Sequence, residues 1–392
     1  MTRLLVSTTQ RYAPAHEPSG FLYVIDLEAW RIIQRATGFE TPFREYDINL
    51  RGGMRGLRGI CVKDGEIAFA NYATVFCFDT HWNLTRTFTS PLCSSIHEYL
   101  LDGDGIIITS TVNDHLLFLD VESKLIRSWC IHTEEELTRA IKIGKSMLTS
   151  CEITSGKLDF RDIRNFKMDH HDRAHLNSLC RLENGDVLVS LGLIVNAQYS
   201  MLARMKEYLI DGGAWNHILD INRKIRTLLG LKKKILTDLV IQPARWQSAV
   251  VRLTPNGRST LLFKLDNVIN PNHTVRVLPD GTGIYLGTSF GSVIHFDVDS
   301  GKILASTEIS DLFLRGGVHV AGEWFAIGAG NQLLLYDIHA RKVLKNLLLS
   351  DNPNESVHGL DILPPEFDLP PDSFEEKFGR ISGFDGAKIL WS

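Results

Sequence analysis

The sequence predicts an all-β fold, a six-bladed β-propeller, and three observations support this prediction. A unit of four short apolar segments recurs about every 40 residues where nothing is inserted, which is the repeat length of a propeller blade. The first segment of a unit begins near a histidine or arginine, and the third ends at an aspartate in most units. The chain also starts with an incomplete unit and ends with a segment that would complete it.

The clearest unit lies in the middle of the chain. His175 begins a predicted strand, Asn184-Gly185 forms a tight turn, and Val187 begins a second strand. His175 and Asn177 are two residues apart and therefore share one face of a regular strand. The strands expected to line the propeller axis span residues 57–63, 96–102, 175–182, 273–279, 316–321 and 357–363. The third strands of the blades end at Asp26, Asp79, Asp120, Asp297 and Asp337.

The two ends of the chain are expected to form one blade together. Residues 4–36 contain three strands without an inner one, and residues 357–363 form an inner strand with nothing after it. Pairing of this C-terminal strand with the N-terminal blade would close the ring and leave no open sheet edge. We therefore expect residues 1–392 to form a single propeller domain.

Insertions interrupt the repeat at three places. Residues 132–171 precede blade 4 and open with a predicted short helix whose capping box begins at Thr133. Residues 196–243 lie within blade 4 and have apolar residues at helical spacing, which predicts a mostly helical, lid-like insertion. A shorter irregular piece spans residues 10–20. All three fall in loops on one side of the disc, and residues 364–392 form a proline- and acid-rich tail that we expect to pack loosely.

Composition excludes several classes of partner. The 42 basic and 46 acidic residues give a formal net charge of −4, so no nucleic-acid partner or membrane-surface role is indicated. No apolar run reaches the roughly 18 residues of a membrane span, and the N-terminus lacks the pattern of a secretory signal. The six cysteines include no CxxC pair, which suits buried thiols in a reducing compartment. The expected location is cytoplasmic.

One constellation stands out as a candidate site. Residues at equivalent places near the starts of the inner strands would converge on one mouth of the axial channel. These residues are Arg58, His97, His175 with Asn177, His273, Arg315 and His358. Histidine can act as acid, base, nucleophile or metal ligand at neutral pH. Arginine supplies permanent charge and fork-shaped donors suited to carboxylate, sulfate or phosphate.

These residue types leave three functions open. The first is an enzyme acting on a small anionic or aromatic molecule, of group-transfer or lyase type. In it, His97, His175, His273 and His358 are catalytic, and Arg58, Arg315 and Asn177 bind substrate without a cofactor. The second uses the same four histidines as ligands of a divalent metal ion. The third is a non-catalytic interaction platform, in which the histidines only tie neighbouring blades together.

The central unit resembles a motif of arylsulfotransferase-type propellers. The resemblance rests on His175-Leu176-Asn177-Ser178 followed by Asn184-Gly185-Asp186-Val187-Leu188-Val189-Ser190. More broadly, the chain is similar to the gluconolactonase-like and NHL propellers. The resemblance implies six blades and a channel lined by several histidines and an arginine, one histidine accepting a sulfuryl group. That family is typically exported, whereas this chain lacks a signal, and the motif leaves open which histidine would be the nucleophile.

The larger insertion also suggests a possible partner. The helices expected in residues 196–243 could close over the channel mouth as a lid or form a homodimer contact. The basic run Lys232-Lys233-Lys234 at their end is typical of a solvated helix end. The other expected partner is the small-molecule substrate itself.

Overall fold

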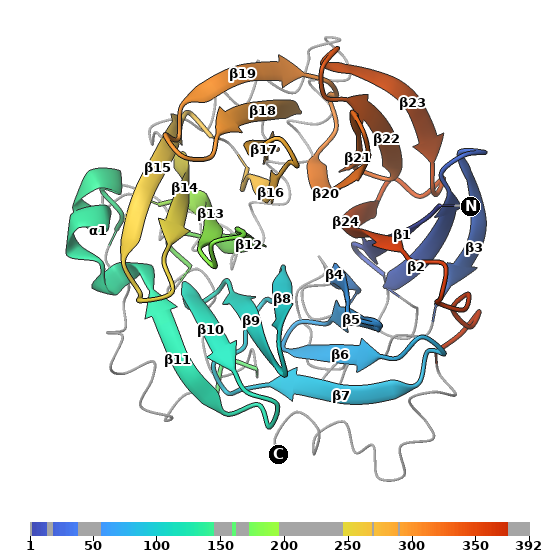
Figure 1. The fold of residues 1–392 in the computed structure, drawn as a ribbon, viewed down its shortest axis with the longest axis horizontal. Coiled ribbons are helices and arrows are strands. Elements are labelled where there is room, and N and C mark those ends of the chain that lie inside the picture. The colour runs from blue at the N-terminus through green and yellow to red at the C-terminus, as the bar shows by residue number, and fades with distance from the viewer. Residues whose placement is uncertain are drawn as a thin grey trace, which may run out of the picture.

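Six four-stranded antiparallel sheets surround a central axis in the computed structural model, which confirms the predicted six-bladed propeller (Figure 1). The structure describes residues 2–13, 19–37, 56–144, 159–161, 172–195, 246–268, 270–288 and 291–374. The predicted helical insertion at 196–243, most of the 132–171 insertion and the end of the tail lie outside these ranges. No helix in the described ranges is long and apolar enough to cross a membrane.

Each blade runs from an inner strand at the axis to an outer strand at the rim. Blade 1 contains β24 (Glu355–Leu363), β1 (Arg3–Gln10), β2 (Gly20–Asp26) and β3 (Arg31–Ala36). Blade 2 contains β4 (Arg58–Lys63), β5 (Glu66–Ala70), β6 (Thr74–Phe78) and β7 (Leu84–Thr89). Blade 3 contains β8 (Tyr99–Asp102), β9 (Gly105–Ser110), β10 (His115–Leu119) and β11 (Leu125–Cys130).

The other three blades repeat this order. Blade 4 contains β12 (Leu176–Arg181), β13 (Val187–Ile194), β14 (Gln247–Leu253) and β15 (Ser259–Asp266). Blade 5 contains β16 (His273–Val277), β17 (Thr282–Gly287), β18 (Ser292–Asp297) and β19 (Ile303–Glu308). Blade 6 contains β20 (Leu314–Ala321), β21 (Trp324–Ala329), β22 (Gln332–Asp337) and β23 (Lys342–Leu348).

The ring closes as predicted, by pairing of the last strand with the first. β24, coloured red in Figure 1, lies beside blue β1 and pairs with it antiparallel along its length. The buried carboxylate of Glu355 accepts hydrogen bonds from the hydroxyls of Thr8 (2.6 Å) and Tyr23 (2.8 Å). The first residue of β24 is thereby tied to the next two strands of blade 1, β1 and β2.

The middle strands of the blades supply most of the core. β6 and β10 are buried at every residue because neighbouring blades cover both of their faces. The rim strands β19 and β23 are mostly exposed. This gradient in burial explains why the third strands read as continuous apolar runs in the sequence.

Two local predictions at the rim and tail are wrong. The helix α1 (Glu135–Ile141) is present, but Thr133 does not cap it: the N-cap residue is Glu134, which makes no side-chain capping bond. Thr133 instead ends a 3₁₀ turn (η2, Ile131–Thr133), and its hydroxyl donates to the carbonyl of Cys130. The tail is also not loose over residues 364–374. Phe374 is fully buried, with its ring 5.7 Å from that of Trp82, and Trp82 Nε1 donates to the carbonyl of Asp368 (2.8 Å). The free energy gained by burying these aromatic rings holds the segment in place despite its proline-rich composition.

The inner strands of blades 1 and 2 approach so closely that a side chain has no room between them. A Cβ on Gly359 would lie 2.5 Å from the carbonyl carbon of Gly59 and 2.7 Å from the nitrogen of Ile60. We expect Gly359→Ala to lower the free energy of unfolding by about 1–3 kcal/mol, since backbone cannot yield as a side chain does. Urea denaturation measures this loss. Gly287→Ala, where the nearest atoms are at 3.4 Å, is the matched control, and equal effects of both variants would contradict the argument.

Candidate active site at the mouth of the axial channel

Four imidazole rings from four different blades meet near the axis. The ring of His97 lies 5.2 Å from that of His175, 5.5 Å from that of His273 and 5.4 Å from that of His358, between centroids. The rings of His175 and His273 are 6.0 Å apart. His97, His273 and His358 are buried, and His175 is partly exposed. The structure therefore brings together all four histidines that the sequence singled out.

Bulges at the starts of the inner strands position these side chains. The pairing register shifts between His273 and Val275 in β16, and between Leu314 and Gly317 in β20. Backbone φ is +65° at Thr274 and +73° at Gly316. Such bulges re-aim side chains and recur next to active sites. Thr274 is β-branched, so its positive φ is a strained conformation, and its hydroxyl oxygen accepts a hydrogen bond from the Gly316 nitrogen (2.9 Å).

A buried carboxylate holds the backbone of His175. Asp114 accepts hydrogen bonds from three consecutive backbone nitrogens, those of Arg173 (2.8 Å), Ala174 (3.0 Å) and His175 (3.1 Å). This turn lets His175 adopt a φ of +51°. The Nδ1 atom of His175 lies 2.7 Å from the carboxylate of Asp172. Because a carboxylate accepts, Nδ1 carries the hydrogen and Nε2 presents a lone pair.

His97 and His358 have opposite tautomers. His97 Nδ1 lies 2.7 Å from the carbonyl oxygen of Ser95, so Nδ1 donates and Nε2 has the lone pair. His358 Nδ1 instead accepts from the backbone nitrogen of Gly59 (3.3 Å), so its Nε2 carries the hydrogen in the neutral ring. These assignments follow from the identity of the partners. The site therefore combines imidazole lone pairs with one imidazole hydrogen-bond donor.

Three arginines lie near the cluster of imidazoles. Arg315 is buried at 8 % exposure and has no hydrogen bond or ion pair with any residue in the described part of the chain. Arg58 is equally buried and donates to the hydroxyl of Ser95 (2.9 Å). Arg11, which the sequence analysis did not single out, comes from the loop after β1 and lies 5.9 Å from the Phe313 ring. An anionic ligand would satisfy the charge of Arg315.

Burial and these charges keep the imidazoles neutral. Burial lowers the pKa of His97, His273 and His358 well below the ordinary value, and the charge of Arg315 lowers each of them further. Burial also lowers the pKa of Arg315 itself, and the charges of Arg58 and Arg11 reinforce the effect. Neutral imidazoles can accept protons or bind a metal ion at neutral pH.

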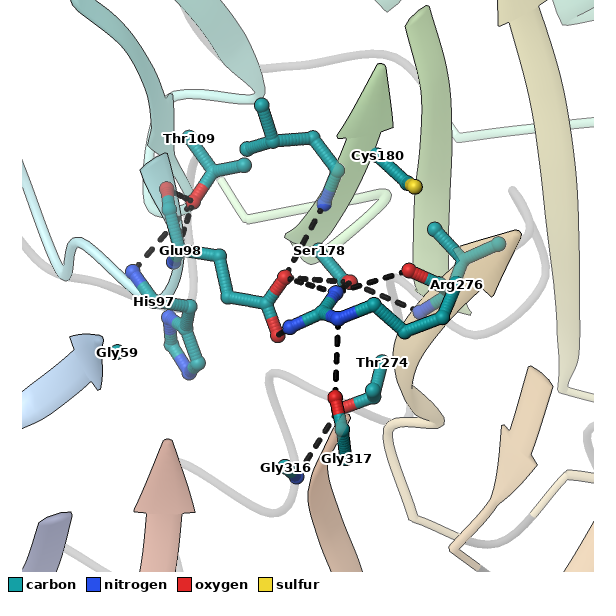
Figure 2. A network of polar contacts seen from close by, with 12 residues as sticks. Gly59, His97, Glu98, Thr109, Ser178, Cys180, Thr274, Arg276, Gly316 and Gly317 are labelled. Carbon is teal, nitrogen blue, oxygen red and sulfur yellow. Dashed lines mark hydrogen bonds and ion pairs between the residues drawn. The ribbon is translucent and has the colours of Figure 1, made fainter. Parts of the chain in front are cut away.

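An ion pair joins the inner strands close to His97. Figure 2 shows the carboxylate of Glu98 facing the guanidinium of Arg276, with the side chain of His97 nearby. Glu98 Oε2 is 2.9 Å from Arg276 Nη1 and accepts a hydrogen bond from the Ser178 hydroxyl (2.7 Å), and Arg276 Nε donates to the carbonyl of Gly317 (3.0 Å). The pair links the inner ends of blades 3, 4, 5 and 6.

The aspartate next to His358 also serves as a tie between blades. Asp361 Oδ2 accepts a hydrogen bond from the backbone nitrogen of Val62 (2.8 Å) in the neighbouring inner strand. Burial raises the pKa of Asp361 to about 6. Like Glu98, Asp361 accepts a hydrogen bond from the inner strand of a neighbouring blade.

Asn177, predicted to bind substrate, has its donor engaged within the fold. Its Nδ2 donates to the carbonyl of Asn272 (2.6 Å), and it packs where Gly192 leaves room for it. The bulge between Leu176 and Ser178 breaks the regular alternation that would place Asn177 on the same face as His175. The site proposed below does not include it.

The sequence matches no family model, and it matches no curated protein. Solved structures share its architecture. A nidogen/laminin complex structure has a TM-score of 0.52 and 8 % identity, covering 92 % of this chain and 98 % of that chain. A virginiamycin B lyase from Staphylococcus aureus has a TM-score of 0.44 and 9 % identity, covering 89 % and 90 %. The expected likeness to this broad group of propellers is confirmed as a likeness of fold.

Proposed function

We propose that this protein is an enzyme that transforms a small anionic molecule at the His/Arg-lined mouth, by group transfer or elimination. The observation that carries this proposal is the buried guanidinium of Arg315. It makes no hydrogen bond or ion pair with the described residues, only a longer-range attraction to Glu98, and it stands beside imidazoles whose pKa values it depresses. An unpaired buried charge is costly to a fold, so its retention fits a ligand that supplies the opposite charge.

The residues at the mouth have complementary roles in this proposal. Arg315 and Arg58 bind the anionic group and stabilise negative charge that develops during the reaction, which is most effective in a site of low polarity. His358 donates a hydrogen bond through Nε2. Phe313, 5.6 Å from the His273 ring, offers an apolar surface for an aromatic part of the substrate.

Binding of simple anions tests the proposal before the substrate is known. Sulfate, phosphate, benzoate and 4-nitrophenyl sulfate should each be titrated against the protein and followed by thermal shift, with release of nitrophenol recorded for the last. We expect at least one of these anions to raise the melting temperature. Arg315→Gln should weaken that binding about 10- to 100-fold, the effect of losing a charged hydrogen-bond donor.

A matched arginine away from the mouth provides the control. Arg127 donates to the carbonyl of Pro255 at the rim, and Arg127→Gln should bind the anions as the unmodified protein does. Equal thermal shifts in Arg315→Gln and the unmodified protein, or no shift with any of the anions, would contradict the proposal.

A further inference from the structure

Three imidazole nitrogens in the site are arranged as ligands for one ion. His97, His175 and His273 each offer a ring nitrogen, and these atoms all lie within 4.8 Å of one another. They come from three consecutive blades, so the rigid propeller rather than a single loop sets their spacing. The rings of His97 and His273 stack, with an angle of 18° between their planes, and that of His175 stands across both.

The hydrogen bonds of two of these rings favour metal coordination. His97 Nδ1 donates to the carbonyl of Ser95, and the Thr111 hydroxyl oxygen, 2.9 Å away, reinforces this tautomer because its own hydrogen goes to the carbonyl of Leu176. His175 Nδ1 donates to Asp172. A histidine held through one nitrogen by a carbonyl or carboxylate, with the other nitrogen open, is the usual arrangement around a metal ion.

His358 belongs to the same cluster but has the wrong tautomer for a ligand. Its Nδ1 accepts the hydrogen of the Gly59 nitrogen, so a neutral His358 ring keeps its hydrogen on Nε2. Coordination through Nε2 would require this ring to become an anion or to give up its bond to Gly59. The cluster therefore divides into three rings that offer lone pairs and one that offers a hydrogen.

We propose that His97, His175 and His273 bind one divalent transition-metal ion, and that His358 remains outside the coordination shell as a hydrogen-bond donor. Imidazole ligands suit zinc, iron, copper and nickel better than magnesium or calcium. Three neutral ligands leave the full charge of the ion in place, next to Arg315 and Arg58. An anion is needed to balance the charge of the ion and to fill its coordination shell. This requirement agrees with the anionic substrate of the proposed function.

The role of the metal ion rests on the proposed function, since both concern the same site. Metal binding itself, however, can be measured without a substrate. The full-length protein, free of any histidine tag, is stripped with a chelator and titrated with Zn²⁺ and Co²⁺. Elemental analysis then gives the metal content, and the visible spectrum of bound Co²⁺ reports imidazole coordination. We expect one tightly bound ion per chain.

The variants separate the three ligands from the fourth histidine. His97→Gln, His175→Gln and His273→Gln should each abolish stoichiometric binding, and Asp172→Asn should weaken it about 10- to 100-fold. His358→Gln should keep full metal content, as should His295→Gln, a buried histidine bonded to Tyr336 in blades 5 and 6. Circular dichroism establishes that each variant is folded.

Two outcomes would overturn the inference. One is failure of the folded protein to bind either ion, and the other is loss of metal in His358→Gln to the same degree as in the three ligand variants. Anion binding that still depends on Arg315 while no metal binds would reject the metal site and keep the proposed function. Stoichiometric metal binding without any anion binding would keep the metal site and reject the proposed function.

Discussion

Replacing Glu98 by alanine should lower the free energy of unfolding by about 2–3 kcal/mol, less than for a fully buried ion pair because the Arg276 side chain is 22 % exposed. The carboxylate accepts from the Arg276 guanidinium, the Ser178 hydroxyl and the Leu179 nitrogen at once. Its loss leaves the arginine charge without its counterion between the inner strands. Urea denaturation followed by tryptophan fluorescence measures the change.

The matched control is an exposed salt bridge between two neighbouring inner strands. Asp102 of β8 pairs with Arg181 of β12, but these side chains are 37 % and 38 % exposed, and Asp102→Ala should cost less than about 1 kcal/mol. A second variant tests the cause. Glu98→Ala combined with Arg276→Met removes both charges and should recover most of the lost stability. A loss below 1 kcal/mol in Glu98→Ala would show that the pair does not hold the blades together.

Acid should destabilise the metal-free protein steeply. The folded pKa values of His97, His273 and His358 are lowered, mainly by burial, whereas unfolded histidine titrates near about pH 6.5. Below that pH these three histidines bind protons in the unfolded chain but stay neutral in the folded protein. Stability is therefore complete above about pH 6.5 and falls with pH, by about 3 kcal/mol between about pH 6.5 and about pH 5.5 for three such groups.

Comparison of variants isolates this effect from other titrating groups. Asp361 acts with opposite sign, because its pKa of about 6 lets the folded protein bind a proton before the unfolded chain does. His273→Gln should remove about one third of the histidine contribution to the slope. Gly287→Ala, which removes no titrating group, should leave the slope unchanged. Stability that is flat from pH 7.5 to pH 5.5 in the chelator-treated protein would contradict the expectation.

The repeat in the sequence was sufficient to predict the blades, their closure and the convergence of the histidines. These features depend on patterns that recur, such as apolar third strands and a polar residue at each inner-strand start. The direction of the Asn177 side chain could not be predicted, because a bulge between Leu176 and Ser178 interrupts the alternation of side chains between the two faces of the strand. A bulge depends on contacts with the neighbouring strand, which leave little trace in a single sequence.

Residues supplied by non-repeating segments were harder to find. Asp172 and Asp114 orient His175 from a loop and from the end of a different blade. Arg11 lies in the connection between β1 and β2, away from the inner-strand starts that drew attention to the histidines. The buried aromatic packing of Phe374 depends on Trp82, almost three hundred positions earlier in the chain. Such pairs come together only in the tertiary structure. The composition of the tail alone therefore gave the wrong prediction that it packs loosely.

The closing strand has a consequence for protein synthesis. Thr8 and Glu355, which bond across the seam, are separated by 347 positions. A ribosome delivers the N-terminal parts of a chain first, so the three nitrogen-offering histidines emerge well before His358 exists. A nascent or prematurely terminated chain that ends before β24 therefore lacks both the strand that closes the ring and His358, the hydrogen-bond donor of the proposed site.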